Sequence, residues 1–293
     1  MGKMFTFATY NTKDYLRNPD ELARARLVEQ VVAGLGADAI ALQELPGHSP
    51  RRAAEGLKQL AQATGMACLL PGVRGAEPAP AIAIGHDQLS VGLLWRPGTV
   101  EPIPGTSQAY EGEQAGFWHA LLAGEFEVQG QRVALASSHA PPRAGRERRV
   151  PEAHRLAELL GDYAFVVLGQ DRNSVGADLT SEGNFYDPDP HQPDAHSKWG
   201  DPLPETGYPT DRTPSAILTA AGLVDMQPYL RLPWEATTGR HWPDERNGPR
   251  RLDEIRASEA MARCAVSLEV VDSRDAFVAS DHLPVVATFN LAG

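Results

Sequence analysis

The chain has 293 residues and carries 27 Lys and Arg against 38 Asp and Glu, which gives a formal net charge of −11 at pH 7. With 42% hydrophobic and 22% charged residues, its composition is typical of a globular protein and excludes a disordered or fibrous one. The acidity argues against a protein that coats nucleic acid electrostatically, because neutralising phosphates requires clustered Lys and Arg. It is compatible with an enzyme that holds cations.

The two cysteines, Cys68 and Cys264, match neither a zinc-ligand spacing nor a disulfide framework, so we expect both to be small core residues. No apolar stretch of the sequence approaches the roughly 20 residues that cross a bilayer. The default expectation is therefore a cytoplasmic, monomeric protein without a membrane span.

The first part of the chain predicts alternating strands and helices. Residues 4–10 alternate like a half-buried strand, and residues 20–35 carry apolar side chains at helical spacing. A buried strand at 39–42 and a second helix at 53–63 follow. This order is typical of helices packed on a sheet.

The middle of the chain instead predicts strands in direct succession, with Gly130 marking a hairpin turn. The remaining predicted elements are strands at 89–95, 117–128, 132–138 and 164–168, helices at 151–160 and 214–221, and strands at 252–256, 266–271 and 284–291. Two stretches, 174–212 and 230–250, are rich in Pro, Asp, Gly and Trp and show little periodicity. Loops of that length are usually functional or mobile. The simplest interpretation is a single α/β domain over residues 1–293 with two elaborated loops.

Polar residues stand at the ends of several apolar strands, where functional groups gather in α/β sheets. They are Asn11, Glu44, His139, Asp171, Asn173, Asp253, Asp281 and His282. Taken singly, each has an ordinary alternative as a turn former, a solvated carboxylate or a loop cap. Together they supply hard oxygen donors suited to Mg²⁺ or Mn²⁺ and two histidines able to move protons near neutral pH.

Seven short motifs, six of which hold these residues, follow one another in an order that is specific although each motif alone is weak. The motifs are Tyr10-Asn11, Leu42-Gln43-Glu44, Gly92 to Arg96, Ser138-His139, Gly169 to Asn173, Leu252 to Ile255 and Ser280 to His282. The series resembles the endonuclease/exonuclease/phosphatase superfamily, which is DNase I-like. That group includes DNase I, exonuclease III-type repair nucleases, deadenylases, neutral sphingomyelinases and inositol polyphosphate 5-phosphatases. The resemblance runs from the N-terminus almost to the last predicted strand.

The resemblance implies an α/β (α+β) fold, a four-layer α/β sandwich. In that fold two mixed β-sheets pack face to face, helices cover both outer faces, and the site lies at one edge. It also implies that Glu44 is the principal carboxylate for a Mg²⁺ ion, with Mn²⁺ as a substitute, and that Asn11 and Asp281 lie close to the same ion.

For the other motif residues the resemblance implies catalytic roles. Asp171 and Asn173 would position the attacking water and the scissile phosphate. Asp253 would orient His282, which contacts the phosphate or assists the nucleophile. His139 matches a second histidine that contacts phosphate or donates a proton.

The sequence departs from the family pattern at four points. Gln170 stands where a small residue is common, Arg172 where an aromatic or apolar one is, and Glu254 where Tyr is common. Pro46 also ends the resemblance to the Gln-Glu-Thr-Lys element of exonuclease III-like enzymes. These differences argue against an abasic-site endonuclease or an inositol phosphatase.

Arginines close to the motifs are candidates for phosphate contacts, namely Arg143, Arg172 and Arg251. Arg143 opens a basic cluster that follows His139 in the sequence. The alternative interpretation is that these arginines are solvent-exposed residues leading into the next helix. Arg172 is equally compatible with a salt bridge that points away from the site. Arg251 belongs to a basic group before Asp253 that is similarly ambiguous.

The two long loops hold aromatic and acidic residues with two interpretations each. Trp199, Trp234, Trp242, Phe185 and Tyr186 could stack on bases, although anchoring of the loop is the commoner role. A second group consists of Asp187, Asp189, His191 and His196. Residues of these types could bind another metal ion, although such a sequence more often forms a loop rich in turns.

The sequence therefore predicts metal-dependent hydrolysis of a P–O bond, most simply by a phosphodiesterase or nuclease acting on DNA or another nucleic acid. The main alternative is a phosphatase or phosphodiesterase acting on a small phosphorylated metabolite or a lipid headgroup. A Ser/His/Asp hydrolase built from Ser138, His139 and Asp281 lacks a Gly-x-Ser-x-Gly elbow. A non-catalytic binding module is disfavoured because a competent residue fills every proposed catalytic position.

Overall fold

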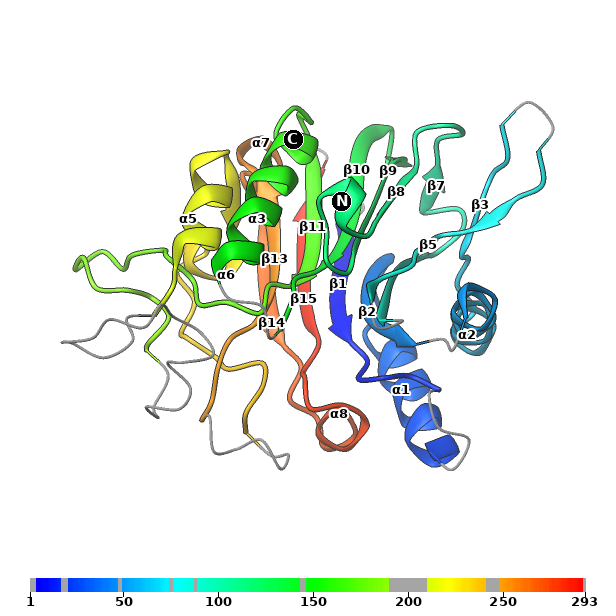
Figure 1. Cartoon of the computed structure of the whole chain (residues 1–293), viewed down its shortest axis with the longest axis horizontal. Coiled ribbons are helices and arrows are strands. Elements are labelled where there is room, and N and C mark those ends of the chain that lie inside the picture. Colours follow the sequence, from blue (N-terminus) through cyan, green and yellow to red (C-terminus); the bar gives the residue numbers. More distant parts are fainter. Residues whose placement is uncertain are drawn as a thin grey trace.

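The computed structural model describes residues 4–16, 21–46, 49–73, 76–86, 89–142, 146–189, 210–240 and 248–291. Two large mixed sheets occupy its centre and pack face to face (Figure 1). Helices cover the outer face of each sheet. The expected four-layer α/β sandwich is confirmed.

The first sheet has the strand order β14-β15-β1-β2-β6-β5. Its strands are β1 (Met4–Asn11), β2 (Ala39–Pro46), β5 (Ile82–Ala83), β6 (Leu89–Trp95), β14 (Ala265–Val270) and β15 (Val285–Asn290). β1 runs parallel to β2 and antiparallel to β15. The first and last large strands of the chain are therefore direct neighbours.

The second sheet has the order β12-β13-β11-β10-β9-β7, with β8 also paired to β9. Its strands are β7 (Val100–Pro102), β8 (Gln108–Glu111), β9 (Ala120–Val128), β10 (Gln131–His139), β11 (Val166–Asp171), β12 (Leu223–Asp225) and β13 (Asp253–Ser258). A separate small hairpin pairs β3 (Leu69–Leu70) with β4 (Ala79–Pro80).

The longer helices flank the sheets. α1 (Leu22–Gly34), α2 (Pro50–Thr64) and α8 (Arg274–Ala279) lie on the side of the first sheet, and α3 (Arg146–Leu160) and α5 (Thr213–Ala220) lie on the side of the second (Figure 1). Short turns of helix complete the connections, namely η3 (Glu113–Ala115), α6 (Met226–Tyr229) and α7 (Glu259–Ala262). No helix in the part of the chain that the structure describes is long and apolar enough to cross a membrane.

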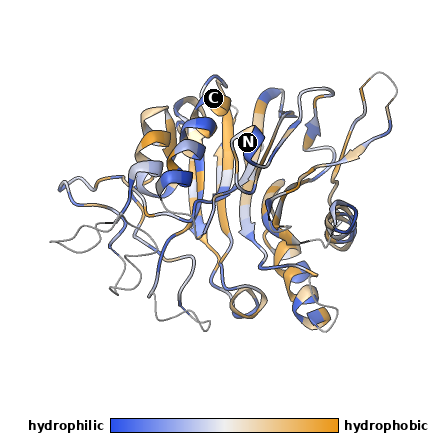
Figure 2. Cartoon of the chain, viewed as in Figure 1, coloured by the Kyte–Doolittle hydropathy of each residue, from blue (hydrophilic) through white to orange (hydrophobic). Residues whose placement is uncertain are grey.

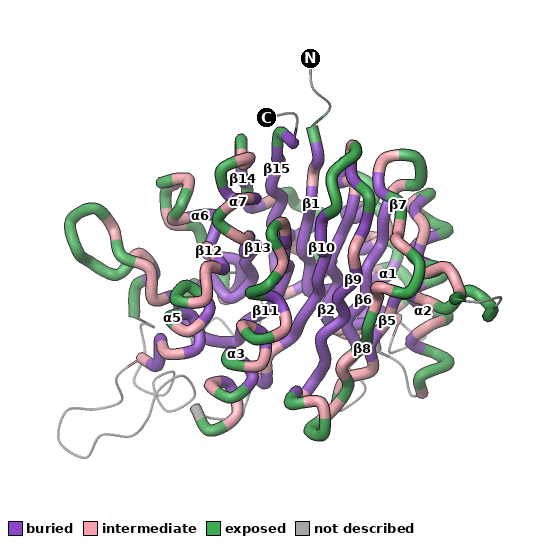
Figure 3. Tube along the Cα trace, turned by 90° about the horizontal axis from the view of Figure 1, so that it is seen from above, coloured by how far each residue is buried: buried purple, intermediate pink, exposed green. Residues whose placement is uncertain are grey.

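Burial explains why the central strands read as continuous apolar runs. A sheet covered on both faces must place apolar side chains on both sides of each strand. Figure 3 accordingly shows the central strands buried and the connecting loops exposed, and Figure 2 shows hydrophobic residues along the same strands. One apolar cluster fills the space around the first sheet and between the sheets, and a second lies between the second sheet and α3 and α5.

The predicted elements agree with the structure in type, and most of their boundaries differ by only a few residues. The predicted strand at 89–95 coincides with β6. The predicted hairpin turn consists of Gln129 and Gly130, both with positive φ, which is the conformation that a two-residue hairpin loop requires. α3 begins at Arg146 rather than at Pro151, so the proline lies inside the helix. Cys68 and Cys264 are free cysteines, the first buried and the second half-buried.

Candidate active site

The polar residues singled out from the sequence meet at one edge of the two sheets. Asn11 and His139 are the last residues of β1 and β10, and Asp171 ends β11, which runs parallel to β10. Asp253 opens β13 and pairs with Asp171 in the antiparallel register. The carboxyl ends of the parallel strands β10 and β11 meet at the same edge, and the packing of β1 against β11 brings Asn11 to it.

Glu44 reaches this edge through an irregularity in β2. The pairing of β2 with β6 shifts between Leu42 and Leu45, which places two residues of β2 opposite one of β6. Glu44 sits in this bulge with φ of 53°, in the left-handed region that few residues other than glycine adopt. Bulges re-aim side chains, and strained backbone of this kind concentrates at functional sites.

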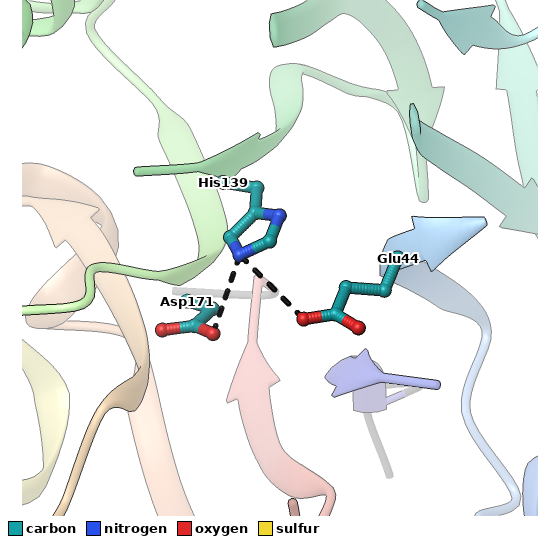
Figure 4. Close-up of side chains that lie close together, drawn as sticks. All are labelled: Glu44, His139 and Asp171. Atoms are coloured by element: carbon teal, nitrogen blue, oxygen red, sulfur yellow. Dashed lines mark ion pairs between the residues drawn. The ribbon is translucent and has the colours of Figure 1, made fainter. Parts of the chain in front are cut away.

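His139 lies between two carboxylates. Its Nε2 is 3.5 Å from Asp171 Oδ2 and 3.9 Å from Glu44 Oε1 (Figure 4). The amide nitrogen of Asn11 joins the same carboxylates, donating to Glu44 Oε1 at 3.1 Å and to Asp171 Oδ2 at 3.0 Å. Four strands, two from each sheet, thus contribute to one compact polar cluster.

Asn173 closes the cluster on the side of the second sheet. Its backbone N–H donates to Asp171 Oδ1 at 3.0 Å, and its side-chain nitrogen donates to the carbonyl of Ala140 at 2.9 Å. The same nitrogen lies 3.2 Å from His139 Nε2. Asn173 has φ of 45°, a conformation that Asn tolerates better than most residues.

His282 and Asp253 form a buried pair beside this cluster. His282 Nδ1 lies 2.7 Å from Asp253 Oδ2 and 3.9 Å from Asp171 Oδ2. The backbone N–H of Asp253 donates to Thr237 Oγ1 at 3.1 Å, which anchors the start of β13 at this point. The expected contact between Asp253 and His282 is therefore present in the structure.

The charges of these groups shift each other's pKa values. Burial raises the pKa of Glu44, although His139 and His282 partly offset it. For Asp171, burial acts in the same direction, but the neighbouring His282 and His139 outweigh it and lower its pKa well below the usual range. Burial alone would lower the pKa of His282, yet the carboxylates of Asp253 and Asp171 raise it to about 10.

The donor set fits a divalent cation. In the described residues, two groups have ligand atoms within 4.8 Å of one another, one formed by Glu44, His139 and Asp171 and the other by Asp171, Asp253 and His282. Asp253 Oδ1 is buried, and no described residue donates a hydrogen bond to it. Carboxylate oxygens gathered in this way suit hard cations such as Mg²⁺.

The expected trio of Asn11, Glu44 and Asp281 is only partly assembled. Asn11 faces Glu44 with its amide nitrogen, while its Oδ1 accepts a hydrogen bond from the backbone of Lys13 at 3.0 Å. Asp281 forms an ion pair with Lys13 at 2.6 Å and belongs to neither carboxylate group. The charge of Asp281 still raises the pKa of Glu44, so its place beside the same ion stays a prediction.

The proposed phosphate contacts of Arg172 and Arg251 do not agree with the structure. Arg172 forms ion pairs with Asp187, Asp225 and Glu254. Arg251 pairs with Asp187 and Asp225, both at 2.7 Å. All five side chains are buried, so these guanidinium groups stabilise the protein interior instead of facing a substrate. Arg143 lies outside the described residues.

The aromatic residues of the long loops act mainly as anchors where the structure describes them. The guanidinium of Arg212 covers the ring of Phe185 at 4.0 Å, and the hydroxyl of Tyr186 donates to the carbonyl of Leu232 at 2.9 Å. Trp234 is half-buried. Asp187 takes part in the ion pairs above, and Asp189 pairs with Arg212. Four further candidates lie outside the described residues, namely His191, His196, Trp199 and Trp242.

His119 is a site residue that sequence reasoning missed. Its ring stacks on that of His139, with centroids 4.4 Å apart and 8° between the planes. The two-residue turn at Gly130 fixes the register of β9 on β10 and pairs Ala120 with His139. The hairpin prediction therefore contained the signal, because it places residue 119 beside His139.

The two packed sheets and the site at their edge define the fold of the DNase I-like endonuclease/exonuclease/phosphatase proteins. Solved structures of this fold match nearly the whole chain. D. rerio TDP2 complexed with a single-stranded DNA product has a TM-score of 0.63 and 17% identity, covering 98% of this chain and 99% of that one. A mannosyl-6-phosphatase from Bacteroides thetaiotaomicron has a TM-score of 0.59 and 15% identity, covering 97% and 98%.

A third similar structure is an endonuclease/exonuclease/phosphatase family protein from Leptotrichia buccalis, with a TM-score of 0.58 and 13% identity over 97% of this chain and 98% of that one. No protein-family model matches the sequence, and no curated protein matches it either. At these identities the likeness establishes the fold, and the chemistry must be argued from the site.

Proposed function

We propose that the protein is a divalent-metal-dependent phosphodiesterase that hydrolyses a P–O bond, with a nucleic acid or nucleotide-like molecule as its substrate. The observation that carries this proposal is the cluster of Glu44, His139, Asp171 and His282 at one sheet edge. Its two facing carboxylates flank histidines with raised pKa values. That combination of cation ligands and proton donors is what phosphoryl hydrolysis requires.

Glu44 and Asp171 are the residues that would hold the cation, and Asn11 would keep their oxygens in place through its two hydrogen bonds. A bound Mg²⁺ would neutralise a non-bridging phosphate oxygen and the charge that develops on the leaving oxygen. Asp171 is ionised at neutral pH because its pKa is lowered. Its carboxylate, held by Asn173 N–H, can orient an attacking water.

The two histidines would stabilise the negative charge of the substrate phosphate and of the leaving group. Asp253 accepts from Nδ1 of His282, so the ring keeps one orientation and presents Nε2 as its second donor. With a pKa of about 10, His282 is cationic at neutral pH and can donate to a phosphate oxygen. Burial lowers the pKa of His139, but Asp171 more than offsets it and leaves a ring able to protonate a leaving group.

A metal-dependent phosphomonoesterase is the second candidate. The same cluster could serve a monoester, and one structurally similar protein is a mannosyl-6-phosphatase. The diesterase is preferred because another similar protein, TDP2, was solved with a single-stranded DNA product. Both candidates share the carboxylates and histidines and differ only in the substrate.

The deciding experiment is an activity screen with Mg²⁺ or Mn²⁺ over plasmid DNA, single-stranded DNA, RNA, bis-p-nitrophenyl phosphate and phosphomonoesters that include mannose 6-phosphate. We expect diester cleavage that EDTA abolishes and that Glu44→Gln lowers at least about 100-fold. Glu55→Gln is the matched control, because Glu55 is an exposed carboxylate paired with Arg51 on α2. Full activity in EDTA or in Glu44→Gln would refute the metal role, and cleavage confined to monoesters would select the second candidate.

A further inference from the structure

Three side chains from separate segments form a stack beside the site. The rings of His86 and Trp118 lie with centroids 3.9 Å apart and 28° between their planes. The guanidinium carbon of Arg148 lies 3.9 Å from the centroid of the Trp118 ring. We call these three residues the ring platform. His86 is exposed, and Trp118 is half-buried.

The platform is joined directly to the candidate active site. His119, which follows Trp118, stacks on His139 and points its Nδ1 at the carbonyl of His86, 3.1 Å away. One imidazole therefore separates the platform from the histidine that faces Asp171. A substrate whose phosphate lies at His139 would have its next group within reach of the platform.

Buried and surface contacts hold the platform in shape. The backbone N–H of Trp118 donates to Oε1 of the buried Glu152 at 2.6 Å, and Arg148 pairs with Glu113 at 2.6 Å. Aromatic stacks with a cation over one ring lower the freedom of all members, so the platform is ordered before any ligand arrives.

Sheet pairing places the platform at the same edge as the catalytic cluster. The β9 residue Ala120 pairs with His139, which puts Trp118 at that end of the second sheet. The β6 residue Leu89 pairs with Pro46, two residues beyond Glu44, which puts the segment of His86 at the same end of the first sheet. The platform therefore lies on the β6 and β9 side of the site.

We propose that the ring platform binds a planar group of the substrate, of nucleobase type, next to the scissile phosphate. This inference rests on the proposed phosphodiesterase function and specifies its substrate class. A base offers a π-face that can stack on exposed His86, whereas a methyl group, an aliphatic lipid headgroup or a sugar offers none. Arg148, paired with Glu113, braces the Trp118 ring from its own helix and so supports the stack on which the base would lie.

The test compares two esters that share the scissile bond and the leaving group, the p-nitrophenyl ester of thymidine 5′-phosphate and methyl p-nitrophenyl phosphate. Base stacking on an aromatic side chain corresponds to roughly 5- to 150-fold in affinity. We expect wild type to prefer the thymidine ester at least about ten-fold in kcat/KM, and His86→Ala to lose most of this preference. His86→Phe should keep it, because the phenyl ring preserves the stack.

Arg155→Ala is the matched control. Arg155 lies on the same helix as Arg148 and covers another ring, that of Tyr110 at 5.9 Å, outside the platform. We expect this variant to leave both rates unchanged. Thermal unfolding of each variant separates loss of the platform from loss of the fold, and Trp118→Leu provides a second disruption of the same stack.

The proposal is overturned if wild type shows no preference for the thymidine ester, or if His86→Ala and Trp118→Leu lower both esters equally. Hydrolysis of both esters without preference would refute base binding by the platform and would leave the proposed phosphodiesterase function in place. If neither ester is hydrolysed with Mg²⁺ or Mn²⁺, the proposed function fails. Calorimetric binding of thymidine 5′-monophosphate then decides the platform: weaker binding by His86→Ala supports it, and equal binding refutes it.

Discussion

His119 and His139 stack face to face, with ring centroids 4.4 Å apart and an interplanar angle of 8°. Both rings are buried, and they belong to neighbouring strands or strand ends of one hairpin. Burial and the neighbouring His139 lower the pKa of His119 to about 3. His119 is therefore a neutral plate beside His139, whose Nε2 faces two carboxylates.

Removing the His119 ring should make the orientation of His139 less fixed and leave the carboxylates of Glu44 and Asp171 in place. We expect His119→Ala to lower kcat on bis-p-nitrophenyl phosphate roughly ten-fold, in line with other residues that orient a catalytic group. His119→Phe restores a flat ring and should recover most of the activity. Steady-state kinetics with parallel thermal unfolding measures both, and a Phe variant as impaired as the Ala variant would contradict the positioning role.

Asp253→Asn should weaken His282 while keeping the shape of its partner. The amide retains a hydrogen-bond acceptor for Nδ1 at the 2.7 Å contact but removes the charge that holds the ring protonated. We expect activity on the same diester to fall roughly 10- to 100-fold. Asp275→Asn, in the first turn of α8, is the control and should match wild type. Equal activity of both variants would show that the charge of Asp253 is not needed.

The sequence predicted the centre of the site because hydrophobic periodicity marks where strands end. Asn11, His139 and Asp171 are terminal residues of their strands, so locating each strand located its polar residue. The resemblance to a known superfamily added their order and the pairing of Asp253 with His282. The β9–β10 hairpin was also predictable from the sequence, because Gly130 marks its turn locally.

The partners of Arg172 were beyond sequence reasoning. They come from a loop, from the end of β12 and from β13, at separations of 15, 53 and 82 residues. No local pattern encodes such pairs, and a basic residue beside a catalytic motif reads equally well as a phosphate contact. Asp171 ends β11 and faces His139, whereas the guanidinium of the next residue, Arg172, lies in the buried ion-pair network.

Arg172→Met should therefore affect stability. Removing one partner of a buried ion pair strands its carboxylates, which typically costs about 3–5 kcal/mol of unfolding free energy. Arg172→Lys should rescue little, because one ammonium cannot meet Asp187, Asp225 and Glu254 together. Urea denaturation measures the loss, and Arg51→Met on the exposed pair with Glu55 should cost at most about 0.5 kcal/mol. Similar losses in both variants would refute the network's importance.

The buried carboxyl of Glu152 predicts a specific pH dependence of stability. Burial raises its pKa from 4.5 to about 8, only partly offset by the hydrogen bond from Trp118 N–H. Between these two pH values the folded protein keeps a proton that the unfolded chain has released. The contribution of Glu152 to stability must therefore fall as pH rises through this window.

Glu152→Gln removes the titrating group and should flatten this dependence. As the pH rises from 4.5 to 8, the unfolding free energy of the variant should increase relative to that of wild type by on the order of a few kcal/mol. The control is Glu158→Gln, an exposed position on the same helix, which should track wild type at every pH. Urea titrations at several pH values give the comparison, and parallel curves for wild type and Glu152→Gln would show that Glu152 ionises normally in the folded protein.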